Sequence, residues 1–290
     1  MTMVIELDEG LRRPLRASAP PATQADQLGL LADLPGTWVG GGFNVVALPT
    51  GHGGFRLKLN ATIETLSFTP VGGAIPNRGS VQGDISLFGL HYLQQVSDST
   101  TFEGLHVEPG LWLNVPATTD PEAPATIVRQ STIPHGDSLL AQSTFLTDIA
   151  GGPTIDEVST IPTGDDPKLK RTGYTDPYLN PALPAGIPRG AQINPNILLT
   201  NALEAQAEKG MKVVRTQVIQ VSTQPVGGIV NIPFVTANAN ATKLDAIFWI
   251  ETVEQADGTQ FQQLQYTQTV ILNFDNIDWP HISVATLVKQ

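Results

Sequence analysis

Apolar and polar residues alternate along most of the chain from Gly36 onward, in segments rich in Val, Ile, Leu, Thr and Phe that are separated by Gly, Pro and Asn. The last but one of these segments shows the pattern most clearly, because its apolar side chains share one parity, as a half-buried strand requires. We predict strands at Thr37–Leu48, Phe55–Phe68, Ser80–Val96, Thr101–Asn114, Thr126–Ile133, Ser138–Leu146, Val213–Val221, Leu244–Glu254, Gln260–Phe274 and His281–Val288. Successive strands with short loops predict an all-β fold, a closed antiparallel up-and-down barrel of about ten strands.

Two regions depart from this pattern. Residues 1–33 are rich in Pro and Ala, with a short helix expected at Thr23–Ala32, and we interpret them as an arm lying on the main domain. We expect residues 34–290 to form a single barrel domain with one Pro-rich and helical insertion at 163–210. Its helix, Pro195–Lys209, carries Ile197, Leu198, Leu203 and Ala207 at helical spacing. We expect this stripe to pack on the barrel, as a lid or an interface element, or on a second subunit of a homodimer.

The composition supports a fold of strands and loops and limits the classes of molecule that we expect the protein to bind. Only 15% of the residues are charged, whereas Gly and Pro contribute 27 and 23 residues. The 27 acidic and 16 basic residues give a net charge of −11. An acidic chain is unsuited to nucleic acid or to anionic lipid, since both require a basic surface. We therefore expect a small-molecule partner and no nucleic acid.

The absence of cysteine excludes disulfides, thiolate metal sites and cysteine nucleophiles. The first ten residues contain three acidic side chains and no apolar core of a signal peptide, and no run of about 18 apolar residues occurs anywhere. From these features we expect a soluble, cytoplasmic protein without a membrane association. Sequence motifs of serine hydrolases, zinc proteases and nucleotide-binding loops do not occur.

Two of the five histidines stand in patterns that suggest a site. His106 and Glu108 point to the same face of a strand, so the carboxylate can fix the imidazole tautomer and raise its pKa. The alternative for this pair is an ordinary polar contact at a barrel rim. His281 shares a face with Ser283 and Ala285, whose small side chains leave room for a flat ligand. The alternative for His281 is a structural histidine that caps the rim against Trp279.

Four short segments resemble nitrobindin-like heme-binding barrels, a group of calycin-type barrels. The segment Gly36-Thr37-Trp38-Val39-Gly40-Gly41-Gly42 is similar to their opening strand. Leu105–Gly110, Thr132–Gly136 and Pro280–Leu287 resemble later motifs in the same order. The resemblance implies that His281 is the axial ligand of heme b and that His106 lies near the heme. The greater length of this chain and its insertion depart from that family.

Three functions remain open from the sequence. The first is a heme b barrel that acts on nitric oxide, peroxynitrite or peroxide, with His281 as the metal ligand. The second is a lipocalin-like binder of an apolar metabolite without a metal. The third is a cofactor-free isomerase or cyclase that uses a pocket histidine and carboxylate. We expect the ligand to contact five further residues, His106, Glu108, Trp38, Ser283 and Ala285.

Overall fold

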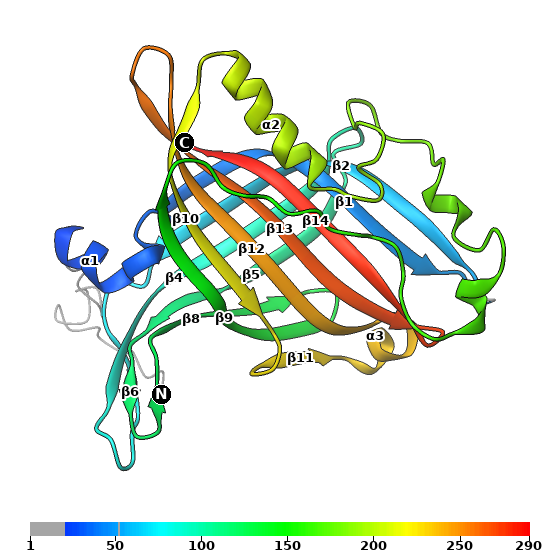
Figure 1. Ribbon diagram of the computed structural model, residues 1–290. Coiled ribbons are helices and arrows are strands. Elements are labelled where there is room, and N and C mark those ends of the chain that lie inside the picture. The colour runs from blue at the N-terminus through cyan, green and yellow to red at the C-terminus, as the bar shows by residue number, and fades with distance from the viewer. Residues whose placement is uncertain (1–20, 52) are drawn as a thin grey trace, which may run out of the picture.

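Ten long strands close into a single antiparallel barrel in the computed structural model, which describes residues 21–51 and 53–290. Each strand pairs with the next one in the sequence, and β14 returns to β1 through pairs from Trp38–Lys289 to Val45–Ile282 (Figure 1). The predicted closed up-and-down barrel is therefore confirmed. Its strands are β1 (Gly36–Pro49), β2 (Phe55–Pro70), β4 (Ile85–Asp98), β5 (Gly104–Val115), β8 (Thr126–Ile133), β9 (Asp137–Ala150), β10 (Lys212–Ser222), β12 (Asn240–Glu254), β13 (Gln260–Phe274) and β14 (Ile277–Lys289).

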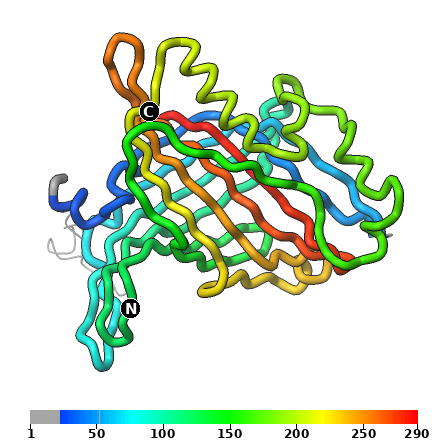
Figure 2. Tube along the Cα trace, in the orientation of Figure 1, coloured from blue at the N-terminus to red at the C-terminus, as the bar shows by residue number. Residues whose placement is uncertain are grey.

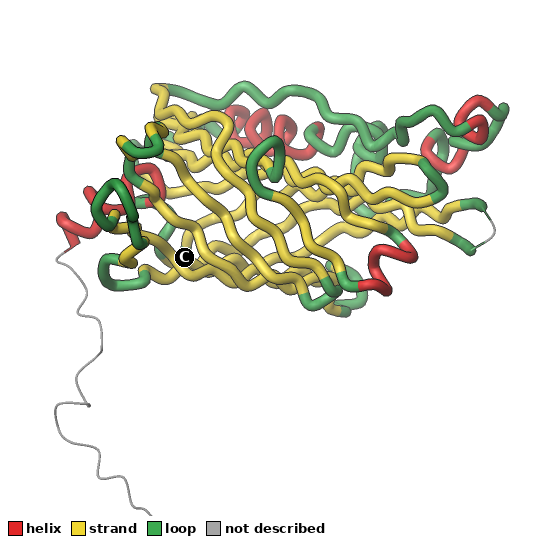
Figure 3. Tube along the Cα trace, turned by 90° about the horizontal axis from the view of Figure 1, so that it is seen from below, coloured by secondary structure: helices red, strands yellow, loops and turns green. Residues whose placement is uncertain are grey.

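The boundaries differ from the prediction mainly where the sequence lacks a clear turn. The segment predicted to begin at Ser80 contains a loop, and β4 begins at Ile85, with the short β3 (Ile75–Asn77) paired against it. The last strand begins at Ile277 rather than His281, because Asp275 and Asn276 both adopt positive φ and make a tight hairpin turn. Strands cross the barrel obliquely and run along most of its length, as Figure 3 shows.

One end of the barrel interior is filled by large side chains. Trp38 is fully buried there, and its indole N–H donates to the carbonyl of Leu34 at 2.8 Å. Leu28 and Leu31, from α1 (Pro21–Leu28) and the 3₁₀ helix η2 (Gly29–Leu31), cover the same end. Their neighbours include Leu66, Phe68, Leu90, Tyr92, Trp112 and Leu287. We call this the closed end, because the buried Trp38 plugs the barrel there.

Two glycines of β1 allow the neighbouring strand to approach closely. A Cβ atom on Gly42 would lie 1.9 Å from the carbonyl oxygen of Val284, and one on Gly40 would lie 2.1 Å from that of Thr286. On their other side these glycines pair with Thr62 and Glu64 of β2, which line the cavity described below.

The segment between β9 and β10, residues 151–211, packs against the outside of the barrel. It contains the 3₁₀ helices η3 (Pro167–Lys170) and η4 (Asp176–Tyr178) and the helix α2 (Ile197–Glu208). Tyr178, Ala191 and Leu199 bury a second apolar core against outward-facing residues of the wall, namely Phe43, Val45, Trp249, Trp279, Ile282 and Val284. In Figure 1, α2 lies along the outer wall beside β10 and β14.

The expected helix in this segment is confirmed, and its predicted packing face is correct in part. Leu198 packs against the outer core as predicted, but the buried residue of α2 is Leu199, and Ala207 is exposed. Polar contacts complete the face: the Gln265 side chain donates to the Leu199 carbonyl, and Thr267 donates to Asn196 Oδ1 at 2.6 Å. The sequence pattern did not indicate this contact, because Gln265 and Thr267, the residues of β13 that contact α2 and its N-terminal end, are polar.

Shorter elements extend the two rims. Near the closed end, β6 (Thr118–Thr119) and β7 (Glu122–Ala123) form a small hairpin beside the loop before β4, and Gln82 Oε1 accepts from the backbone of Thr119 at 2.6 Å (Figure 2). At the opposite end, β11 (Gly228–Asn231) pairs with β9 and leads into α3 (Pro233–Asn238). We call β11 and α3 together the β11–α3 segment.

Candidate functional site

A cavity of about 410 Å³ occupies the half of the barrel interior away from the closed end. Its walls combine apolar side chains with a few polar ones, and the β11–α3 segment contributes to its outer boundary through Ile229 and Val235. The residues of 151–211 do not line it, so the insertion covers the outer wall and is not a lid on this cavity. The lining is Asn44, Val46, Leu48, Lys58, Asn60, Thr62, Glu64, Gln94, Val96, Leu105, His106, Ile133, His135, Asp137, Leu139, Ile229, Val235, Ala239, Ala241, Leu244, Tyr266, Gln268, Val270, Leu272, His281 and Ser283.

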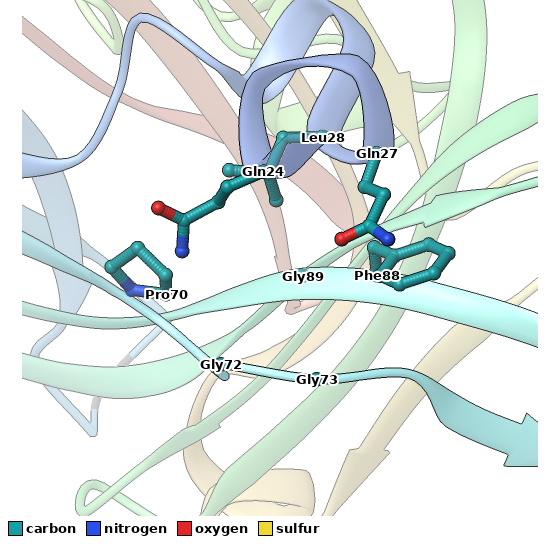
Figure 4. A pocket seen from close by; sticks show the side chains of 8 residues that line it. All are labelled: Gln24, Gln27, Leu28, Pro70, Gly72, Gly73, Phe88 and Gly89. Carbon is teal, nitrogen blue, oxygen red and sulfur yellow. The ribbon is translucent and has the colours of Figure 1, made fainter. Parts of the chain in front are cut away.

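Two other hollows lack this combination of size, apolar walls and polar side chains. A crevice between α1 and the strand β4, bounded by Gln24, Gln27 and Phe88, holds only about 10 Å³ (Figure 4). That space is no larger than a single water requires. A polar depression of about 470 Å³ lies at the rim beside α3 and is formed by hairpin tips such as Asp275 and Asn276. The barrel cavity is therefore the hollow with apolar walls and converging polar groups.

His281 faces this cavity from β14 and is held by Asn44 of β1. Its Nε2–H donates to Asn44 Oδ1 at 2.7 Å, and the Ser283 hydroxyl donates to the same oxygen at 2.9 Å. Burial, together with the nearby imidazoles of His106 and His135, lowers the pKa of His281 to about 4. His281 is therefore neutral at pH 7, and no hydrogen bond from the described residues engages its Nδ1.

His106 is backed by a buried ion pair. Its Nε2 lies 3.2 Å from Glu108 Oε2, and Glu108 Oε1 accepts from the Arg129 guanidinium at 2.5 Å. Tyr92 donates to Glu108 and accepts from Arg129 Nε at 3.1 Å. Burial by itself would raise the pKa of Glu108, but the Arg129 charge and the His106 contact hold that pKa well below its ordinary value. Glu108 is consequently an anion that orients the His106 ring.

His135 and Asp137 approach His106 from the turn between β8 and β9. The rings of His106 and His135 lie 5.5 Å apart, centroid to centroid. Burial and the neighbouring His106 lower the pKa of His135, whereas burial raises the pKa of Asp137. His135 thus lies on the turn and also lines the cavity.

Glu64 lies on the inner wall of the cavity within a cluster of neutral donors. Its carboxylate accepts from Thr62 Oγ1 at 2.8 Å, from Tyr266 OH at 2.6 Å and from Gln94 Nε2 at 3.3 Å. Burial raises the pKa of Glu64 against these hydrogen bonds. The four residues come from β2, β4 and β13, so only barrel closure brings them together.

The structure separates the predicted site residues into two groups. His106, Ser283 and His281 line the cavity. Glu108, Trp38 and Ala285 do not: Glu108 lies behind His106, and the other two are buried in the core of the closed end. Sequence reasoning missed Asn44, Glu64, Tyr266 and Arg129. The available signal was parity, since each occupies an inward position of its strand while bearing a polar group.

Among residues 21–51 and 53–290, no group of three or more His, Asp or Glu side chains is arranged to hold a metal ion. Nor does that part of the chain contain a helix long and apolar enough to cross a bilayer.

No protein-family model and no curated protein matches this sequence. Among solved structures, the crystal structure of Rv2717c from M. tuberculosis is similar, with 17% identity and a TM-score of 0.47 over 94% of this chain and 99% of that one. At this identity and TM-score the likeness gives no information on a ligand, so the function of this chain must be inferred from its own residues.

Proposed function

We propose that this barrel binds a small, largely apolar molecule in its interior cavity. The observation that carries the proposal is the cavity of about 410 Å³, whose volume lies in the range of about 300–1,000 Å³ typical of small-molecule sites. Apolar side chains such as Val96, Val270 and Leu272 supply contact area, and a few polar groups supply orientation. A solvent-filled barrel of purely structural purpose has no need of buried carboxylates and imidazoles at such positions.

The proposal predicts that a neutral fluorescent probe binds inside the barrel. N-phenyl-1-naphthylamine should bind the wild type and gain fluorescence, whereas Val270→Trp should weaken its binding by roughly tenfold or more because the larger side chain fills the cavity. Val230→Trp is the matched control, since Val230 lies on β11 with 74% of its surface exposed and does not line the cavity. Equal binding by the wild type and Val270→Trp would contradict an interior site.

A second candidate, heme b, is favoured by the geometry around His281. A neutral imidazole whose far nitrogen donates to a fixed acceptor is the arrangement that orients a metal-binding histidine, and Asn44 provides that acceptor here. His281 would hold the iron through Nδ1, and the apolar walls would cover the porphyrin faces. When bound, heme supplies an iron position open to nitric oxide, peroxynitrite or peroxide.

Titration with hemin tests this candidate. A Soret band should develop with the wild type and be lost in His281→Ala. His91→Ala is the control, because His91 is an exposed residue of β4 outside the cavity. Failure of the wild type to take up hemin, or equal spectra for the wild type and His281→Ala, would remove heme and leave the apolar-ligand barrel.

A further inference from the structure

We propose that Glu64 recognises a protonated amine at the deep end of an otherwise apolar ligand. The inference rests on the proposed function, because it names the chemical class of molecule for the same cavity. It follows from the placement of a buried carboxylate that lines the cavity and has no ion-pair partner in the part of the chain that the structure describes.

Glu64 has three hydrogen-bond donors but no ion-pair partner among the described residues, and the His106 imidazole acts on it only at longer range. The side chain is 3% exposed, and its three donors, Thr62, Tyr266 and Gln94, are all neutral. Within the described residues, no Lys, Arg or His nitrogen lies within ion-pair distance of its oxygens. A carboxylate offers about four acceptor sites, so one remains after three hydrogen bonds. The donors hold the group in place and leave that site for a ligand.

Glu108 shows how this barrel can stabilise a buried carboxylate that does not line the cavity. It is fully buried, and Arg129 from the adjacent strand β8 supplies the cation at 2.5 Å. A buried carboxylate is costly without such a partner. Glu64 lies in the same interior, and the space beside it is cavity rather than arginine. Glu251 is also buried without an ion-pair partner among the described residues, but it does not line the cavity. Beside Glu64 the cavity leaves room for a ligand that supplies the cation.

The remaining charges of the lining favour the same class of ligand. His281 and His135 have lowered pKa values and are largely neutral at pH 7. Asp137 adds a second carboxylate, and its Oδ1 is buried without a hydrogen-bond partner. Two further basic side chains line the cavity: Lys58, which is solvent-exposed, and His106, which is paired with Glu108. A cation in the interior therefore meets attraction from Glu64 and Asp137, with apolar walls around its hydrocarbon part.

Competition against bound N-phenyl-1-naphthylamine at pH 7 tests the inference with octylamine, octan-1-ol and octanoate, which share one hydrocarbon chain and differ in charge. The wild type should bind octylamine roughly tenfold or more tightly than octan-1-ol, and octanoate more weakly than both. Glu64→Gln should remove the preference for the amine and leave octan-1-ol binding unchanged. Glu251→Gln, which makes the same substitution at a buried glutamate outside the cavity, should behave as the wild type does.

The outcomes separate the two proposals. If octan-1-ol or octanoate competes as well as octylamine, the role of Glu64 is overturned while the apolar site stands. The same holds if Glu64→Gln keeps the wild-type preference. If none of the three compounds displaces the bound probe, the amine inference is overturned while the probe site stands. If the probe itself does not bind the wild type, the apolar site is overturned. The wild-type comparison decides the charge preference even if Glu64→Gln fails to fold.

Discussion

Arg129→Met is expected to lower the free energy of unfolding by about 3–5 kcal/mol, as removal of one partner from a buried ion pair typically does. Arg129 is 1% exposed, and its guanidinium donates to Glu108 and Tyr92 while lying 5.5–5.7 Å from the ring centroids of Tyr92, Trp112 and Phe248. Methionine keeps part of the packing but leaves Glu108 charged among apolar groups. Urea unfolding of the two proteins measures the difference.

The double variant Glu108→Gln with Arg129→Met provides the control. It removes both charges and retains an acceptor for Tyr92 and His106, so it should be clearly more stable than Arg129→Met alone. If the double variant is as unstable as the single one, the loss comes from packing of the guanidinium and not from the stranded carboxylate.

We expect the free energy of unfolding to fall as pH rises, because Glu251 loses its proton. This residue of β12 is fully buried beneath α2; its Oε2 accepts from Gln263 at 2.6 Å and its Oε1 has no partner. Burial outweighs that hydrogen bond and raises its pKa to about 8 from 4.5. The folded state therefore binds the proton more tightly than the unfolded state does. The shift adds roughly 3–5 kcal/mol to the free energy of unfolding below about pH 4.5. This stabilisation is lost progressively as pH rises to about 8.

Comparison of the wild type with Glu251→Gln isolates this contribution from other titrating groups. The glutamine does not titrate, so the variant should gain stability relative to the wild type between about pH 5 and 8 and differ from it by a constant amount below that range. Unfolding by urea at a series of pH values provides the measurement. A difference independent of pH would show that Glu251 stays charged or gains a partner in the folded protein.

Alternating polarity and turn residues in the sequence were sufficient to determine the barrel. Each strand carries its own period of two, and Gly, Pro and Asn mark the turns, so strand order in an up-and-down barrel follows from chain order. The expected helix near Pro195 was identified correctly for the same reason, because helical spacing is a local signal. The strand boundaries at Ile85 and Ile277 depended on turns that are not marked by glycine or proline alone.

Tertiary structure alone decided which polar residues meet. Glu64 and Tyr266 are far apart in sequence but share a 2.6 Å hydrogen bond, and Asn44 meets His281 because β1 pairs with β14. A strand pattern shows which face a side chain takes, but not which strand lies across the barrel from it. The sequence also did not indicate the outer core under residues 151–211. The residues of the barrel wall that contact this segment are polar as well as apolar, so they form no continuous apolar pattern. The closure of the barrel therefore determined the candidate site, because it sets distances between strands that no local pattern encodes.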